Sequence, residues 1–385
     1  MYGNAALRPL GRETALKSWL PMPLSAEKHS NILSFHREIR CPRSDGTTSN
    51  APLLLAIETT TRCNFQCVHC CHSFSHQVAS DISLELFESV VPSVRGAFEV
   101  YLFGDGEVLL NVPRHLAMIA RIHKEDPNSA LGFSTNGKLL TPEIYEMYAA
   151  AGIEYIQVSV DAATPALYET MRRGGKFQQL QSNLDGILDR RHRARSRQPE
   201  LRLATVISKQ NFRELPLLAE FAKKYGFADW YINAEYPHRP DRDRMRLDSD
   251  DLLELECICK EIAQHYSRDF TARLDSSIAF PTSTAERNRQ CHDLPVYCTV
   301  PWQRFELKAN GDVKICPFFH EPIGSMNVSS LADIWNGREF RQIRQAFTSR
   351  TGIPRFCVNC KFDMRRQYLP GYPGVPESSL LGWGA

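Results

Sequence analysis

Three closely spaced cysteines constrain this chain more than any other feature of its sequence. Cys63, Cys67 and Cys70 are spaced C-x3-C-x2-C, directly after an apolar, threonine-rich run at residues 53–61 that is predicted to be a strand. A [4Fe-4S] cluster held by three protein sulfurs leaves one iron open, whereas a structural metal site normally takes a fourth ligand. Cys71 adjoins Cys70, but neighbouring side chains of an extended segment point apart, so it is not expected to be that ligand.

This loop resembles the cluster loop of the radical S-adenosylmethionine (SAM) enzymes. In that family the open iron chelates SAM through its amino and carboxylate groups. The resemblance therefore implies that Cys63, Cys67 and Cys70 hold a [4Fe-4S] cluster that binds SAM. A zinc loop is the alternative interpretation, and the count of three ligands argues against it.

Composition is compatible with a large iron-sulfur enzyme. The 385 residues are 43% hydrophobic, enough for a large domain or for a core plus a smaller module. A formal charge of +2 predicts no bulk attraction to nucleic acid or to a membrane, and the basic run at residues 190–197 lacks the aromatic residues that stack on bases. We find no long apolar run and no secretory signal, so we expect a cytoplasmic protein. Its 12 cysteines then indicate metal or redox chemistry rather than disulfides.

Strand-like and helix-like segments alternate from residue 53 onward, which predicts a parallel sheet covered by helices. The six expected strands lie at residues 53–61, 99–103, 130–134, 153–160, 201–207 and 230–233. Six such units resemble the partial (β/α)6 TIM-like barrel of the radical SAM core, an α/β fold. One further short helix is expected earlier in the chain, at residues 26–40.

A glycine-rich segment follows the second expected strand, at the strand end where parallel barrels place their chemistry. Its residues Gly104, Asp105, Gly106 and Glu107 resemble the Gly-Gly-Glu-Pro segment of the family, with Val108 in place of the proline. In the family this segment holds the amino group of SAM, so the resemblance implies the same role for these four residues. An ordinary strand-to-loop turn is the alternative.

Further cofactor contacts are expected at the next strand ends. Ser134 and Asn136 follow the third strand, and Ser159 and Asp161 follow the fourth, where the family contacts the ribose of SAM. Arg172, in the segment Met-Arg-Arg-Gly-Gly, is placed to reach a carboxylate of SAM or of the substrate. The alternatives are turn caps and a surface arginine.

A second set of cysteines lies towards the C-terminus, at Cys298, Cys316, Cys357 and Cys360. Between the first two of them, Asn310 and Gly311 separate two strand-like runs, which predicts a β-hairpin, and a helix is expected at residues 331–336.

A hairpin, a helix and a C-x2-C pair resemble the twitch module, the short form of the SPASM module of some radical SAM enzymes. The resemblance implies one auxiliary [4Fe-4S] cluster held by these four cysteines, with zinc as the alternative. We therefore expect the following organisation: an N-terminal extension at 1–51, a radical SAM core at 52–235, a connector at 236–297, a twitch/SPASM-like module at 298–360 and a tail at 361–385.

These cofactors imply an enzyme that generates a 5′-deoxyadenosyl radical and abstracts hydrogen from its substrate. The auxiliary cluster is a natural acceptor for the electron released when the substrate is oxidised. We expect an oxidoreductase similar to the 2-deoxy-scyllo-inosamine dehydrogenase-type enzymes. Its substrate would be a small polar molecule such as a sugar, an aminocyclitol or a related natural-product intermediate, and its reductant a flavodoxin or ferredoxin.

Three alternatives stay open. An epimerase would need a thiol hydrogen donor, and Cys291 is the candidate, although an unliganded cysteine is more often a small buried hydrophobe. A peptide-modifying enzyme is the second, because SPASM-type modules frequently accompany that activity; residues 1–50 are short for the usual leader-binding domain. The third, a zinc-stabilised binding protein without enzymatic activity, does not account for the three-cysteine loop.

Overall fold

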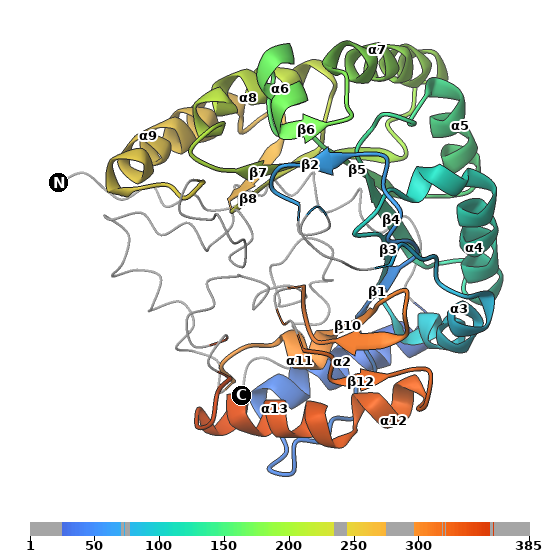
Figure 1. Cartoon of the computed structure of the whole chain (residues 1–385). Helices are drawn as coiled ribbons and strands as arrows, with labels where there is room; N and C mark the ends of the chain where they lie inside the picture. Colours follow the sequence, from blue (N-terminus) through green and yellow to red (C-terminus); the bar gives the residue numbers. More distant parts are fainter. Residues whose placement is uncertain are drawn as a thin grey trace.

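One large sheet organises the molecule. The structure, a computed structural model, describes residues 25–70, 73, 78–234, 245–274, 296–317, 319, 321–354 and 357. Ten strands in this part of the chain form a single sheet in the order β12-β11-β10-β1-β3-β4-β5-β7-β8-β9. Figure 1 shows the sheet curving around the middle of the molecule, with helices outside it.

The six expected strands are present and run parallel to one another, so the predicted fold class is confirmed. They are β1 (Leu54–Glu58), β3 (Glu99–Phe103), β4 (Ala130–Thr135), β5 (Tyr155–Ser159), β7 (Glu200–Ile207) and β8 (Asp229–Ala234). A seventh parallel strand, β9 (Thr271–Leu274), pairs with β8 and was not predicted. Its four residues form no apolar run that marks a buried strand.

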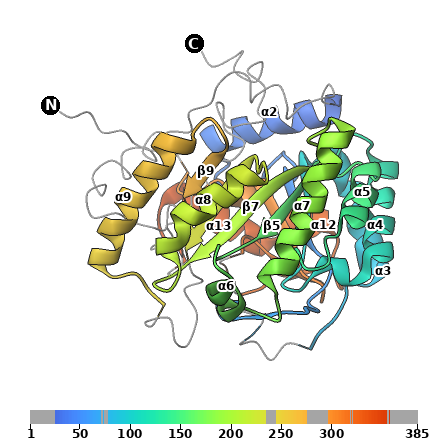
Figure 2. The same ribbon diagram turned by 90° about the horizontal axis from the view of Figure 1, so that it is seen from above.

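Helices cover the outer face of these strands (Figures 1 and 2). They are α3 (Leu84–Val90), α4 (Val112–Glu125), α5 (Pro142–Ala150), α6 (Pro165–Met171), α7 (Phe177–Ala194), α8 (Leu215–Lys224) and α9 (Ser249–Tyr266). Local signals set several of their ends. Thr141 caps α5 by accepting a hydrogen bond from the Ile144 backbone, and Pro142 occupies the first turn. After α3 the chain continues as the 3-10 helix η2 (Val91–Gly96), which has a proline in its first turn.

The inner face of the sheet carries polar and aromatic side chains, while the alternate residues of each strand pack against the helices, because successive side chains point to opposite faces of a strand. In β3, Val100 and Leu102 are fully buried in the hydrophobic core shared with the helices. Glu99, Tyr101 and Phe103 alternate with them and are half-buried. We call the surface formed by such alternating residues the inner face.

The C-terminal part of the described chain joins the same sheet. β10 (Arg304–Leu307) pairs parallel with β1, and β11 (Asp312–Lys314) and β12 (Gly324–Ser325) follow as antiparallel strands. The predicted turn is present between β10 and β11, where Gly311 has a φ of +91°, in the region that favours glycine. Three helices pack beside these strands: α11 (Val300–Gln303), α12 (Leu331–Trp335) and α13 (Arg338–Ser349).

The segment before β1 is attached to these C-terminal helices. It contains the expected helix, α2 (Ala26–Arg40), which lies beside α11 (Figure 1). The Asn50 side chain donates a hydrogen bond to the Trp302 carbonyl oxygen at 2.6 Å, and the Trp335 indole donates to the Asn50 carbonyl oxygen at 2.7 Å. Buried Arg344 donates to the carbonyl oxygens of Gly46 and Pro301. The described part of the N-terminal extension is therefore packed onto the C-terminal part of the chain. No helix among the described residues is long and apolar enough to span a membrane.

Gly132 provides a test of the packing on the inner face. The Tyr155 ring lies across β4 at this position, and a Cβ on Gly132 would sit 1.9 Å from its Cζ atom. We expect Gly132→Ala to lower the free energy of unfolding by about 1–3 kcal/mol, because the ring must leave its place. Urea denaturation measures the change. Gly96→Ala is the control, since its Cβ would meet no atom closer than 3.4 Å, and equal midpoints for the two variants would contradict the expectation.

Candidate active site

The cluster loop begins where β1 ends and is held by a distant part of the chain. Its short strand β2 (Gln66–Cys67) pairs antiparallel with β6 (Arg172–Arg173), which places Cys67 opposite Arg172. The Val68 backbone N–H also donates to the Met171 carbonyl oxygen at 2.8 Å. Cys67 is buried, and Cys63 and Cys70 are half-buried. The segment after β5 therefore anchors the loop that carries all three predicted cluster ligands.

The thiols of this loop are in a partly apolar setting. Burial raises the pKa of Cys67 to about 11, against the opposing effect of the Arg172 guanidinium, and burial also raises the pKa of Cys63. Within the described residues no three His, Cys, Asp or Glu side chains form a group that could hold a metal ion as they stand. The donor chemistry nevertheless fits a three-thiolate cluster, because one loop supplies three sulfurs and Arg172 places positive charge beside Cys67.

Two glycines allow the anchoring segment to approach the cluster loop. Gly174 has a φ of +99°, and a Cβ there would lie 2.9 Å from the Asn64 carbonyl oxygen. A Cβ on Gly175 would lie 2.9 Å from the Phe65 ring. The Arg-Arg-Gly-Gly sequence is thus the packing partner of the cluster loop.

A buried carboxylate, that of Asp161, contacts both the cluster loop and the segment that anchors it. Asp161 is 0% exposed, and its Oδ2 atom lies 2.7 Å from Arg172 Nε and 3.3 Å from His69 Nε2. Its Oδ1 atom accepts a hydrogen bond from the Val206 backbone at 2.8 Å. The structure thus gives the carboxylate of Asp161 and the guanidinium of Arg172 protein partners. Ser159, the other residue expected at this strand end, is half-buried.

The glycine-rich segment after β3 packs against the chain that precedes Cys63. A Cβ on Gly106 would lie 2.0 Å from the Arg62 carbonyl oxygen, and one on Gly104 would lie 2.4 Å from the Thr60 carbonyl oxygen. The Glu107 backbone N–H donates to the Arg62 carbonyl oxygen at 2.7 Å. Both glycines are therefore needed for close contact between the expected SAM segment and the base of the cluster loop.

Glu107 connects this segment to the end of β4. Its carboxylate is 1% exposed and accepts hydrogen bonds from the Thr135 hydroxyl and the Asn136 backbone, each at 2.7 Å. Burial raises its pKa. Asn136 in turn donates to the Asn64 side chain at 2.7 Å, next to Cys63. The structure thus brings Glu107 and Asn136 to the cluster loop.

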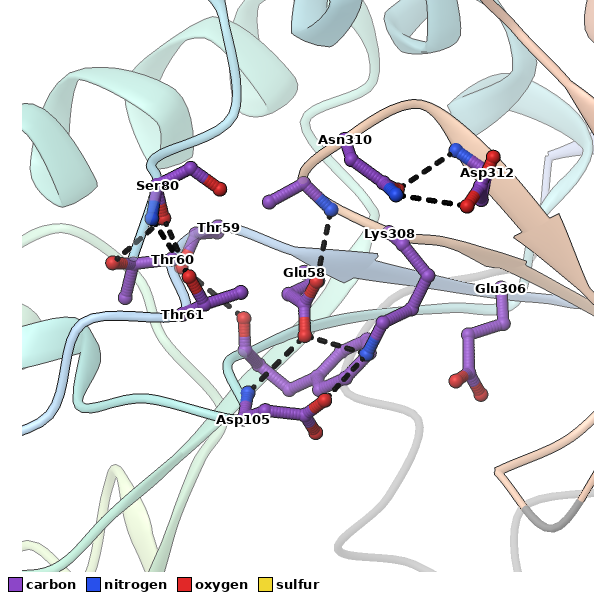
Figure 3. A network of polar contacts seen from close by, with 12 residues as sticks. Glu58, Thr59, Thr60, Thr61, Ser80, Asp105, Glu306, Lys308, Asn310 and Asp312 are labelled. Carbon is purple, nitrogen blue, oxygen red and sulfur yellow. Dashed lines mark hydrogen bonds and ion pairs between the residues drawn. The ribbon is translucent and has the colours of Figure 1, made fainter. Parts of the chain in front are cut away.

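A charged network that we did not predict lies beside the same segment (Figure 3). Lys308 Nζ is 2.5 Å from Glu58 Oε1 and 2.8 Å from Asp105 Oδ2. Glu58 ends β1, so it immediately precedes the cluster loop, whereas Lys308 follows β10. One sequence signal was available: Arg304, Glu306 and Lys308 alternate with apolar residues, which predicts a strand with one charged face.

The expected auxiliary ligands are only partly described. Cys298, Cys316 and Cys357 are half-buried, and the Tyr297 hydroxyl donates to the Cys357 carbonyl oxygen at 2.9 Å, which links the first and third of these segments. Cys360 and the candidate hydrogen donor Cys291 lie outside the described residues.

Comparison with known proteins identifies the class. Residues 57–237 match the Radical SAM superfamily, and residues 298–361 match SPASM, an iron-sulfur cluster-binding domain. The chain is a member of the radical SAM superfamily with a C-terminal SPASM domain. Its cofactors are accordingly a [4Fe-4S] cluster and SAM in the radical SAM domain, and auxiliary iron-sulfur cluster binding in the SPASM domain.

Two curated relatives match over most of their length. The chain is 24% identical to the AdoMet-dependent heme synthase of Methanosarcina barkeri, over 81% of this chain and 92% of that protein. It is also 24% identical to the mycofactocin maturase MftC of Mycolicibacterium smegmatis, over 87% and 84%. Among solved structures, Streptococcus suis SuiB shares the fold with a TM-score of 0.61 and 14% identity, over 79% of this chain and 69% of SuiB.

Proposed function

We propose that this protein is a radical SAM oxidoreductase that oxidises a polar natural-product intermediate with the help of an auxiliary cluster. The observation that carries the proposal is the pairing of β10 with β1. It places the strand of the SPASM domain directly beside the strand that leads into the cluster loop. Both cofactor regions are thereby built on one continuous sheet.

In this proposal Cys63, Cys67 and Cys70 hold the first cluster, and the segment from Gly104 to Glu107 holds the amino group of SAM. The four C-terminal cysteines hold the auxiliary cluster. When bound, the first cluster supplies the electron that cleaves SAM and yields the 5′-deoxyadenosyl radical, and the auxiliary cluster accepts the electron released as the substrate is oxidised. The chain itself holds the cluster loop in place through β6 and Asp161.

The side chains of the inner face favour the proposal of a polar substrate. The rings of Phe103, Tyr101 and Tyr155 stack in sequence, with centroids 5.8 and 6.3 Å apart. Arg202 lies over the Tyr155 ring at 3.4 Å from its centroid, and Gln157 donates to the Tyr101 hydroxyl. Tyr155 and Arg202 are buried, whereas Phe103, Tyr101 and Gln157 are half-buried, so the wall that a substrate can reach consists of aromatic rings, a hydroxyl and an amide, which provide stacking and hydrogen bonding. Such a wall suits a molecule with several hydroxyl or amino groups.

Peptide modification is the second candidate. The match to a mycofactocin maturase extends over 87% of this chain. SuiB, which has the same fold, has been solved with its precursor peptide SuiA. These similarities favour a peptide as the alternative substrate for the same oxidative chemistry.

The role of the auxiliary cluster is tested by the double variant Cys298→Ala/Cys316→Ala. At saturating SAM, we expect the variant to cleave SAM with a rate within about threefold of wild type, while the oxidised product falls by at least about tenfold, because the electron acceptor is lost and the three ligands of the first cluster are kept. The measurement is anaerobic single turnover with SAM and dithionite, quantifying 5′-deoxyadenosine and product by mass spectrometry. The assay is run with two substrate pools, one of low-mass polar metabolites and one of short peptides. The pool in which an oxidised product forms distinguishes oxidation of a small polar molecule from peptide modification.

Cys257→Ala is the control for this experiment, because Cys257 is exposed on α9 and belongs to neither ligand set. It is expected to behave as wild type. Unchanged product formation by Cys298→Ala/Cys316→Ala would show that oxidation does not use the SPASM domain, and the proposal would then be wrong.

A further inference from the structure

One lysine of the SPASM domain reaches the expected SAM segment of the core. The Lys308 side chain is 9% exposed and lies between the carboxylates of Glu58, 2% exposed, and Asp105, 32% exposed. Figure 3 shows the three side chains converging from three different strands or loops. Among the described residues, Lys308 is thus a direct ionic link between the C-terminal domain and the segment that follows β3.

Both carboxylates are held in place at this link. Glu58 also accepts hydrogen bonds from the Ala309 backbone at 2.9 Å and from the Asp105 backbone at 3.3 Å. Burial opposes the charge on Lys308, but Asp105 and Glu58 together raise its pKa. Lys308 lowers the pKa of Asp105 despite the burial of that carboxyl. The lysine therefore stays charged and keeps Asp105 ionised and oriented.

We infer that Lys308 is a positioning residue through which the SPASM domain controls the affinity of the core for SAM. The inference rests on the proposed role of the segment from Gly104 to Glu107 in binding SAM. Without Lys308, Asp105 loses the ion pair that holds its carboxylate, so Asp105 and the backbone of this segment are no longer fixed in place. The amino group of SAM then loses an ordered site.

The same contact couples the two cofactor regions. The hairpin that carries Lys308 leads through β11 to Cys316, a proposed auxiliary ligand. Cluster binding at Cys316 stabilises that hairpin and hence the position of Lys308. Because thermodynamic coupling is reciprocal, an auxiliary cluster tightens SAM binding, and bound SAM favours retention of the auxiliary cluster.

The test compares SAM binding by reconstituted wild type and Lys308→Met. We expect the Kd for SAM, from anaerobic equilibrium dialysis, to rise about tenfold or more with unchanged iron content. We also expect the change that SAM causes in the electron paramagnetic resonance spectrum of the reduced first cluster to appear only at correspondingly higher SAM concentrations. Lys308→Arg, which keeps the charge, should stay within about threefold of wild type.

Lys314→Met is the matched control. Lys314 is on the same hairpin and acts on Asp105 through charge alone, since its effect on the pKa of Asp105 is coulombic. Its loss should change the Kd for SAM by less than about twofold. An increase equal to that of Lys308→Met would overturn the inference, because it would assign the effect to net charge rather than to contact.

A second variant covers the case in which Lys308→Met does not fold, since it leaves Glu58 as an unpaired buried carboxylate. Glu58→Gln/Lys308→Met removes both charges, and Asp105 still loses its partner, so SAM binding should weaken to the same degree. A folded, iron-loaded variant with the wild-type Kd would overturn the inference. Failure of wild type itself to bind SAM would instead overturn the proposed function.

The coupling is tested by adding Cys316→Ala. Alone, Cys316→Ala should raise the Kd for SAM severalfold. In the Lys308→Met background it should add no further change, because the contact between Lys308 and Asp105 that transmits the effect is already absent. Independent effects that simply multiply would contradict the coupling.

Discussion

Replacing Cys63, Cys67 and Cys70 together with alanine is expected to reduce the iron content from about eight to about four atoms per chain and to abolish SAM cleavage. The three cysteines share one loop after β1, and their removal takes away every proposed protein ligand of the first cluster. The measurement is iron and zinc per chain after anaerobic reconstitution, together with 5′-deoxyadenosine formation. The four remaining irons are expected in the SPASM domain.

Cys41→Ala is the control, because Cys41 is exposed at the end of α2, outside both ligand sets. Iron that survives the triple substitution undiminished would show that the assignment of the first cluster is wrong. About four irons plus zinc in wild type would instead remove the auxiliary cluster, and with it the electron acceptor on which the oxidoreductase proposal depends.

Asp161→Ala is expected to lower the free energy of unfolding by about 3–5 kcal/mol, because it leaves Arg172 as an uncompensated buried charge. Asp161 is fully buried, and its partner Arg172 is paired in register with Cys67. The loss should therefore also release the cluster loop and reduce the iron held by the first cluster. Denaturant unfolding under anaerobic conditions and iron analysis measure the two effects.

The exposed ion pair between Glu169 and Lys176 provides the comparison, since its atoms lie 2.5 Å apart at the surface. Glu169→Ala should leave stability and iron content close to wild type. If Asp161→Ala were equally mild, the buried pair would not be what holds the loop.

The sequence alone determined most of the core architecture. Apolar runs located six of its strands, namely β1, β3, β4, β5, β7 and β8. The hairpin was located by Asn310-Gly311, and the observed start of α5 follows the same kind of local signal at Thr141 and Pro142. These features were readable because each depends on interactions within a few residues: caps, turns and the burial of a short apolar segment. The cysteine spacing likewise identified the class of cofactor.

Which distant segments meet is visible only in the folded chain. Nothing local predicts that β10 pairs with β1, that β6 anchors the cluster loop, or that β9 extends the sheet. The same holds for side chains: the sequence predicts cofactor or substrate contacts for Asp161 and Arg172 separately, and the fold brings the two together as a buried pair, as it brings Lys308 to Asp105. Any two strands can form the same backbone hydrogen bonds, so these bonds do not select the partner strand. The partner depends on which sheet edge is open and on which side chains can be buried together. Which edge is open and which side chains are buried together depend on the arrangement of the whole sheet, so neither can be predicted from a few neighbouring residues.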